Sequence, residues 1–523
     1  MSRDELHEKM LVALSEPVSD DKLVALDALW RSQMRMSVRT AGELAKAEEY
    51  RRQETVDFIQ NIGRLSGEER PFIEVCKQLG LQAAAVNDFE RAITYFQACV
   101  DRAAMVGERR TELSAGAMAY LQDADIDRAL ESLARKADFR APRFGASSNP
   151  LKMAVLVSAL IDNNAPSMVS LGYATGMRAL GYDVTVISTE YGKSSGSENL
   201  ARHKALGISA VLLGAGNFLD RFRTAADWLV AQKFDVILWV ITPADVLGRI
   251  LGCLRMAKAQ IYANIACEPN VGEFDAVLAR GSARQEIYTS WPGKSRFTGN
   301  FITIRDEIDA ASPFDRRNLP VQSNAQIIGT FGRVEKCLPK VFTSALITVL
   351  TEHKRAELLI VGPGIPGDID RLKCVFGAAG VVDRVHFLGP MQNDLPALYK
   401  ALDIYCDNSG GQTVIEAMWA GVPVVGWAGP IDEMLLKLKP PDETVKPLGA
   451  DAFTGSLDWI AKNDDPAEYA GLVLSLLRDK DLRQEIADSV KERARKMHDP
   501  AISMQRVDEL IREIISAKDA KRE

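Results

Sequence analysis

The chain has 523 residues, of which 47% are hydrophobic and 26% charged, and this composition is typical of a globular protein of about three domains. Its formal net charge of −7, from 71 acidic and 64 basic residues, gives no general reason for binding nucleic acid or an anionic membrane. We therefore expect no nucleic-acid partner.

The seven cysteines are odd in number and show no C-x-x-C spacing. This pattern favours reduced thiols over disulfides or structural zinc, and it predicts a cytoplasmic protein. The first residues are too charged for a signal peptide, and no apolar run approaches the ~20 residues of a membrane-spanning helix. We expect no transmembrane segment.

Residues 1–145 are predicted to form an all-helical domain, because they contain little Pro or Gly and their apolar residues recur at three- and four-residue spacing. The segment Asp88–Ile93, followed by Tyr95 and Phe96, resembles the second half of a tetratricopeptide (TPR) repeat, and Asp125–Leu130 resembles it more weakly. Two such units are fewer than the roughly three that a free-standing array needs. We therefore expect a TPR-like domain that docks on the remainder of the chain.

Residues 150–300 follow a Pro- and Ser-containing linker and alternate buried strands with helices. This alternation predicts a parallel, doubly wound sheet of Rossmann type. The expected strands are 153–158, 183–188, 210–213, 236–240, 261–264 and 276–278.

A connection near 291–325 leads to a second domain of the same kind at 322–490. Its expected strands are 326–330, 358–361, 385–388, 404–406 and 424–426. We place Asp368 and Asp370 in a solvated turn, so that they form no metal site. The end of the chain, residues 491–523, is charged and has helical periodicity.

Residues 403–425 are predicted to form a buried strand, a glycine-rich turn, a helix and a second buried strand. Gly410 and Gly411 allow the backbone to approach a ligand closely, and the following helix directs its free N–H groups and positive dipole end at an anion. Gln412 and Thr413, in the first turn, would add side-chain donors. The pattern indicates a phosphate-binding site.

Glu416 lies about one turn beyond the first residues of this helix. A carboxylate at that point is placed to accept a hydrogen bond from a sugar hydroxyl. Together with the phosphate site, it predicts a ligand that carries both a diphosphate and a sugar.

These residues carry a resemblance to the nucleotide-sugar glycosyltransferases of GT-B architecture. Ser409–Thr413 and Glu416–Val425 look most like the O-GlcNAc-transferase family and its bacterial relatives, and Ile327–Pro339 resembles the strand, lysine and proline of that family's donor site. The resemblance implies that Lys336 binds the donor diphosphate, with Arg333 as a helper. Glu357–Gly364 and Arg384–Asp403 look like the large retaining branch of the GT-B enzymes.

The implied fold is α/β GT-B, with two Rossmann-like domains facing a cleft and the TPR-like domain before them. The resemblance further implies that the segment 491–523 crosses back to the first Rossmann domain. It implies donor contacts from Gly362 and, for the nucleotide base, from Met391 and Gln392. The donor is expected to be a UDP-sugar rather than a GDP-sugar, and no metal or other cofactor is expected.

Asp162 is the only acidic residue in the loop after the first strand of the first Rossmann domain, and it is our candidate catalytic base. It could instead position the acceptor, and an equally acceptable interpretation is that it caps the helix beginning near Pro166 or forms a loop turn. Two positions depart from the families: Asn408 replaces a usual Glu, and the loop 162–167 lacks a usual His. The stereochemical outcome of transfer is therefore left open.

Three functions agree with the sequence. The first is transfer of a hexose or N-acetylhexosamine to a protein side chain, with the helical domain recruiting the protein acceptor. The second is transfer to a cell-surface polysaccharide or lipid-linked glycan. The third is a non-catalytic scaffold that binds a nucleotide sugar. The sequence leaves homo-oligomerisation open.

Overall fold

The structure is a computed structural model, and it describes the chain in segments. These are residues 69–108, 119–137, 139, 142–162, 165–191, 195–213, 216–263, 270–279, 291, 294–298, 301–391, 394–407, 411–427, 459–461 and 465–520. The chain divides into two compact units, the first made of Met1–Val277 and Ile511–Glu523 and the second of Leu278–Leu510.

The first unit contains the N-terminal helical region. The structure describes this region from residue 69 onward, and residues 1–68 are not among the described residues. Its elements are α5 (Glu69–Ala85), α6 (Phe89–Glu108), the 3-10 turn η2 (Ala119–Gln122) and α8 (Ala124–Lys136). Helices α5 and α6 approach closely at Gly80, where a Cβ would lie 2.5 Å from the Phe96 ring. Ala92 and Phe96 are fully buried. The described part is helical, as expected, whereas the TPR likeness stays a prediction.

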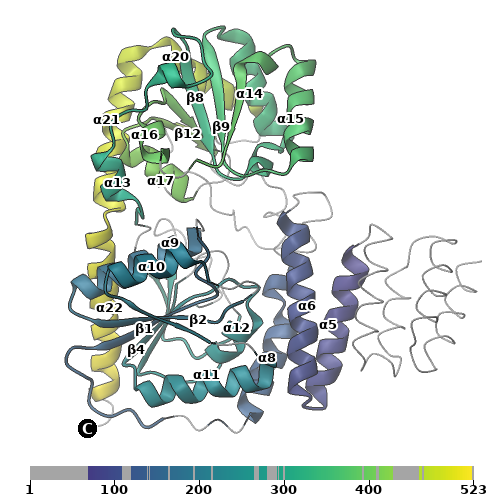
Figure 1. Cartoon of the computed structure of the whole chain (residues 1–523), viewed down its shortest axis with the longest axis vertical. Helices are drawn as coiled ribbons and strands as arrows, with labels where there is room; N and C mark the ends of the chain where they lie inside the picture. The colour runs from purple at the N-terminus through teal and green to yellow at the C-terminus, as the bar shows by residue number, and fades with distance from the viewer. Residues whose placement is uncertain are drawn as a thin grey trace, which may run out of the picture. The chain divides into compact units, whose positions relative to one another are not determined.

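Most of the first parallel sheet lies in the same unit, within the range that ends at Val277. Its elements are β1 (Lys152–Val157), α9 (Ala165–Ala179), β2 (Asp183–Ser188), α10 (Ser197–Ala205), β3 (Ser209–Leu212), α11 (Phe218–Gln232), β4 (Val236–Val240), α12 (Val246–Gly252), β5 (Ala259–Ala263), β6 (Ala276–Ala279) and β7 (Ser295–Phe297). The strand order is β3-β2-β1-β4-β5-β6-β7. Helices α9 and α10 lie on one side of the sheet and α11 on the other (Figure 1). The central strand β4 is buried along its whole length, because helices cover both of its faces.

Polar contacts attach the helical region to this sheet domain within the first unit. The Arg249 guanidinium on α12 donates to the Asp127 carboxylate on α8 at 2.5 Å, and both side chains are almost completely buried. The Gln97 amide on α6 donates to the Ala244 carbonyl at 2.7 Å. Glu90 accepts the Phe218 N–H at the start of α11 at 3.1 Å. The helical region is therefore packed against the sheet domain by specific polar bonds.

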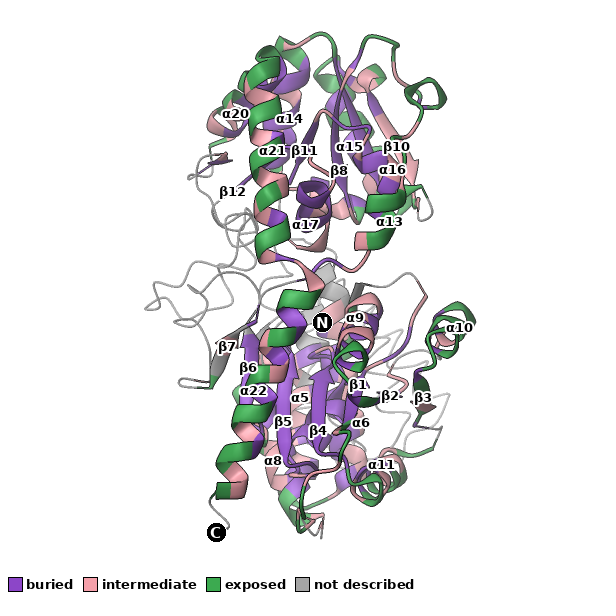
Figure 2. Cartoon of the chain, turned by 90° about the vertical axis from the view of Figure 1, so that its left-hand side faces the viewer, coloured by how far each residue is buried: buried purple, intermediate pink, exposed green. Residues whose placement is uncertain are grey.

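The second unit contains the second parallel sheet. Its elements are α13 (Arg305–Ala310), η4 (Arg316–Asn318), β8 (Gln326–Phe331), η5 (Val334–Cys337), α14 (Lys340–Glu352), β9 (Ala356–Val361), α15 (Pro366–Ala378), η6 (Val382–Arg384), β10 (Val385–Gly389), α16 (Leu395–Tyr399), β11 (Ile404–Cys406), α17 (Gln412–Trp419), β12 (Val424–Trp427) and β13 (Ile460–Ala461). The order β10-β9-β8-β11-β12-β13 is again that of a doubly wound sheet. Buried strands form the interior of each unit in Figure 2. The prediction of two doubly wound domains is confirmed.

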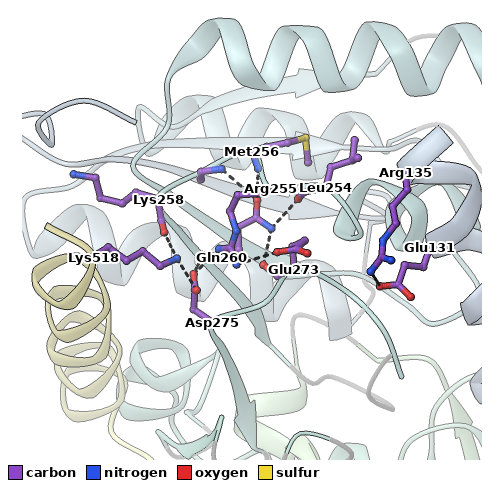
Figure 3. Close-up of polar contacts among 11 residues, drawn as sticks. Glu131, Arg135, Leu254, Arg255, Met256, Lys258, Gln260, Glu273, Asp275 and Lys518 are labelled. Atoms are coloured by element: carbon purple, nitrogen blue, oxygen red, sulfur yellow. Dashed lines mark hydrogen bonds and ion pairs between the residues drawn. The ribbon is translucent and has the colours of Figure 1, made fainter. Parts of the chain in front are cut away.

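Three helices end the chain: α20 (Pro466–Arg478), α21 (Lys480–Met497) and α22 (Pro500–Ala520). The last turns of α22 belong to the first unit. There the Lys518 ammonium donates to the Lys258 carbonyl and to the Asp275 carboxylate, both at 2.6 Å (Figure 3). None of the helices in the described segments is long and apolar enough to cross a membrane.

Three features differ from the expectation. Strand β7 lies inside the segment read as a connection, and strand β13 was not expected at all. Asp368 and Asp370 belong to helix α15, so placing them in a turn was wrong. Pro366 and Gly367 gave a turn signal in the sequence, but Pro is also favoured in the first turn of a helix, and here it begins α15.

Candidate functional site

The order of the second sheet reverses between β8 and β11, which lie side by side at its centre. In open α/β sheets, ligands bind outside the carboxyl ends of the strands at such a switch point. The loop after β8 carries Arg333 and Lys336, and the loop after β11 leads to Gly411 and α17. The topology therefore brings the two predicted phosphate-binding segments to one place.

Glycines fix the backbone at this edge of the sheet. Gly332 donates its N–H to the Val361 carbonyl at 2.8 Å, and Gly362 donates to the Gly389 carbonyl at 2.9 Å. Gly362 has a φ of +143°, and a Cβ there would lie 1.8 Å from the Gly332 carbonyl oxygen. No side chain fits at this position. Gly362 therefore allows the loops after β8 and β9 to meet, and the direct donor contact expected of it stays a prediction.

Lys336 lies in the 3-10 turn η5, and its N–H donates to the Arg333 carbonyl at 3.0 Å. The Lys336 side chain runs back over Gly332, where its ammonium would lie 3.6 Å from a Cβ on that glycine. Arg333 is exposed and pairs with Glu335 at 3.1 Å. The Lys336 ammonium thus lies directly beyond the end of β8. An anion bound at the switch point would lie next to it.

Helix α17 begins after Gly411, whose φ of +120° requires glycine in practice. No side chain caps this helix end. The Gln412 amide donates to the Phe301 carbonyl at 3.1 Å, so in this structure its side chain holds the chain before α13. Gly410, which was also predicted to bind the donor, lies outside the described residues. The positive end of α17 is consistent with an anion site.

Glu416 lies on α17 and is 6% exposed. The Tyr399 hydroxyl donates to its Oε2 at 2.7 Å. Burial raises the pKa of the Glu416 carboxyl to about 7, while the hydrogen bond from Tyr399 acts in the opposite direction. A group that gains or loses its proton near neutral pH therefore lies one turn from the anion site.

Two buried tyrosines at the site were missed by the sequence analysis. Tyr405 on β11 bonds through its hydroxyl to the backbone of Phe331, the last residue of β8. The Tyr399 ring lies 4.7 Å from the Phe331 ring. No local pattern in the sequence indicates that these tyrosines belong to a site, because each lies in a segment whose composition predicts only buried apolar structure.

The remaining predicted residues are Asp162, Met391 and Gln392. Asp162, in the first unit, accepts the Asn199 N–H through its Oδ1 at 2.6 Å and so caps α10. The expected alternative was a cap on the helix near Pro166, and the helix that this carboxylate contacts is α10 instead. Its role as a catalytic base stays a prediction. Met391 is partly buried just after β10, and Gln392 lies outside the described residues. Among the described residues, no cluster of His, Cys, Asp and Glu is arranged to hold a metal ion.

The site formed by the loop after β8 and by the loop and helix after β11 is called the β8–β11 site below. Residues 325–479, which contain this site, match the family model "Glycosyl transferases group 1". No curated protein matches the chain by sequence. Among solved structures, a mutant O-GlcNAc transferase of Thermobaculum terrenum is similar over 98% of either chain, with 16% identity and a TM-score of 0.55.

Two further structures are similar to a smaller part of the chain. HepE of Anabaena, solved with UDP and glucose, is similar over 69% of this chain and 100% of its own, with 17% identity and a TM-score of 0.52. A glycosyltransferase of Rickettsia africae is similar over 70% of this chain and 99% of its own, with 14% identity and a TM-score of 0.54. The shared fold is GT-B, as the sequence predicted. Together with the family match over the β8–β11 site, it identifies the chain as a glycosyltransferase of the GT-B fold.

Proposed function

We propose that this glycosyltransferase transfers a hexose or an N-acetylhexosamine from a UDP-sugar to a protein side chain. The observation that carries the donor half of the proposal is the position of Lys336 and the start of α17 beside the switch point of the second sheet. The similarity to HepE, a structure that contains UDP and glucose, supports a UDP-sugar in particular.

In the proposed reaction, an acceptor group displaces the diphosphate from the anomeric carbon of the sugar. Negative charge then builds on the departing diphosphate, and the Lys336 ammonium and the N–H groups at the start of α17 stabilise it. Tyr399 occupies Oε2 of Glu416, so we assign Oε1 to a hydroxyl of the donor. The mechanism uses no metal ion.

The protein acceptor is supported by how far the similarities extend. The O-GlcNAc transferase structure is similar over 98% of this chain, so the similarity includes the N-terminal helical region. HepE and the Rickettsia africae glycosyltransferase cover 69% and 70% of the chain. The helical region is attached to the first sheet domain by Gln97 and by the Asp127–Arg249 pair. We propose that it recruits the polypeptide.

We place the reaction in the cytoplasm. The six cysteines in the described segments, Cys76, Cys99, Cys253, Cys337, Cys374 and Cys406, are all free thiols. A reducing compartment suits such a set.

The donor half is tested by thermal melting of the full chain with UDP-, GDP- and CMP-sugars. A ligand at about 100 times its Kd should stabilise the folded state by about 2.7 kcal/mol. We expect the UDP-sugars to raise Tm, Lys336→Ala to abolish the rise, and Lys340→Ala to keep it. Lys340 is the matched control, because it is an exposed lysine at the start of α14. A rise that survives in Lys336→Ala would refute the site.

The acceptor half is tested with a UDP-sugar labelled in its sugar and an extract of the cells that make the protein. We expect label that precipitates with protein and is released by protease. Label that extracts into organic solvent, or that stays in protease-resistant polymer, would instead support a glycan acceptor. Donor binding without transfer to any fraction would support the scaffold.

A further inference from the structure

The β8–β11 site is built from two separate segments, and the sheet itself connects them poorly. The ladder between β8 and β11 consists of the pairs Ile404–Ile328 and Tyr405–Gly329. It stops two residues before Phe331, the residue that precedes the loop of Arg333 and Lys336. On the other side, the ladder between β8 and β9 continues to Phe331 and Val361. The end of β8 therefore needs another attachment on the β11 side.

The Tyr405 hydroxyl supplies that attachment. It donates to the Phe331 carbonyl at 3.2 Å and lies 3.4 Å from the Phe331 N–H, which donates to it. The side chain of Thr413, in the first turn of α17, lies close enough to this hydroxyl to lower its pKa. Tyr405 is fully buried, and its ring packs edge-on against the Phe331 ring at 5.7 Å. This hydroxyl is thus bonded to the end of β8 and lies near the first turn of α17, and these are the two segments that form the anion site.

We propose that Tyr405 is a positioning residue that fixes the Lys336 loop and the first turn of α17 relative to each other, so that both contact the diphosphate of the donor. This proposal rests on the proposed function of the site. Tyr405 does not touch the ligand in this scheme. It acts through Phe331 on one side and through Thr413 on the other.

The hydroxyl is suited to a fixed role because burial raises the pKa of Tyr405 well above its ordinary value. It therefore keeps its proton around neutral pH, where its bonds do not change. Tyr399 forms the second connection, from Phe331 through ring packing to Glu416 through its hydroxyl. That connection leads to the sugar-binding carboxyl and not to the diphosphate, which allows the two roles to be separated.

The experiment compares the binding of UDP and UMP to the full chain by calorimetry. UDP has the second phosphate that the two segments would share, and UMP lacks it. Loss of the hydrogen bonds of one hydroxyl costs on the order of tenfold in affinity. We expect Tyr405→Phe to lower the affinity for UDP on the order of tenfold and to leave the affinity for UMP almost unchanged. The ratio of the UDP affinity to the UMP affinity should therefore fall. Tyr399→Phe should weaken both nucleotides alike and leave the ratio unchanged.

Thr413→Val provides a second variant, on the α17 side of Tyr405, where the side chain is only partly buried. It should lower the same ratio, and the double variant should be no worse than Tyr405→Phe alone, because that variant already removes the hydroxyl that Thr413 would contact. Tyr262→Phe is the matched stability control, because Tyr262 is a buried tyrosine of the first unit whose hydroxyl donates to the Ile241 carbonyl at 3.3 Å. It should leave the ratio unchanged.

The failures of the two proposals differ. A wild-type protein that binds neither UDP nor UMP would overturn the proposed function and this inference with it. A wild-type protein that binds UDP, with an unchanged UDP/UMP ratio in Tyr405→Phe and Thr413→Val, would overturn only the role of Tyr405. Additive losses in the double variant would also overturn it, because Thr413 would then contact the diphosphate independently.

Discussion

Glu416 should make the stability of the second unit depend on pH near neutrality. Its carboxyl is buried beside Tyr399, and its pKa is raised from 4.5 to about 7. Between pH 4.5 and about pH 7, the Glu416 carboxyl is protonated in the folded state and ionised in the unfolded state. The stability that comes from this proton is therefore fully present below pH 4.5 and is lost as the pH rises through the folded pKa of about 7. Each pKa unit corresponds to about 1.4 kcal/mol, so the loss reaches about 3 kcal/mol at pH 8.

Glu416→Gln removes the ionisable carboxyl and keeps an amide oxygen that can accept the hydrogen bond from the Tyr399 hydroxyl. The free energy of unfolding of the variant, relative to the wild type, should rise by about 2.5 kcal/mol between pH 5 and pH 8. For a unit of this size, that is about 5–10 °C in Tm. The measurement is a pair of thermal or guanidinium melts at each pH, followed through the second unit.

Glu492→Gln is the matched control, because Glu492 is an exposed glutamate on α21 that pairs only with Lys496 at the surface. Its melts should run parallel to those of the wild type. If the Glu416→Gln and wild-type curves are also parallel from pH 5 to pH 8, then Glu416 is already ionised in the folded state, and the reasoning from its burial is refuted.

Three further predictions concern the architecture of the two units. Gly362→Ala should destabilise the second unit by at least about 3 kcal/mol in a guanidinium melt, because of its positive φ and the clash with the Gly332 carbonyl, whereas Gly367→Ala, with open space around it, should not. Asp127→Ala leaves the Arg249 guanidinium buried without its carboxylate and should cost the first unit about 3–5 kcal/mol in the same assay; a loss below 1 kcal/mol would contradict the buried pair. Lys518→Met should speed hydrogen exchange in residues 511–520 about fivefold, and unchanged exchange would show that the bonds to Asp275 and Lys258 do not hold the end of α22.

The sequence predicts most strands of the two sheets because they are buried on both faces. A strand such as Val236–Val240 is then a continuous apolar run between turn signals. Such a run can be recognised as a strand without knowing which strands lie beside it. Strands β7 and β13 have three and two residues. Segments that short have no periodicity of their own, and only their pairing with a neighbouring strand makes them strands.

The candidate site divides in the same way. Lys336, Gly411 and the start of α17 follow a local pattern of strand end, glycine and helix, so the sequence predicts them. Asp162 shows where local reasoning stops. Its loop position suggests a cap or a base, but the helix that it caps, α10, begins more than thirty residues later in the chain. Which helix end lies near a loop is decided by tertiary packing.

The same limit explains why Tyr405 was missed, and it indicates how the site is stabilised. Glycines hold the loops after β8 and β9 together through backbone bonds, and a glycine with positive φ leaves a trace in the sequence because few other residues fit. Across the switch point, between β8 and β11, the backbone ladder ends early and a side-chain hydroxyl takes its place. A tyrosine in a buried strand has no such trace, since a phenylalanine would fill the same space. The difference between the two residues is one hydroxyl, and the binding of a diphosphate is the property in which that difference should be measurable.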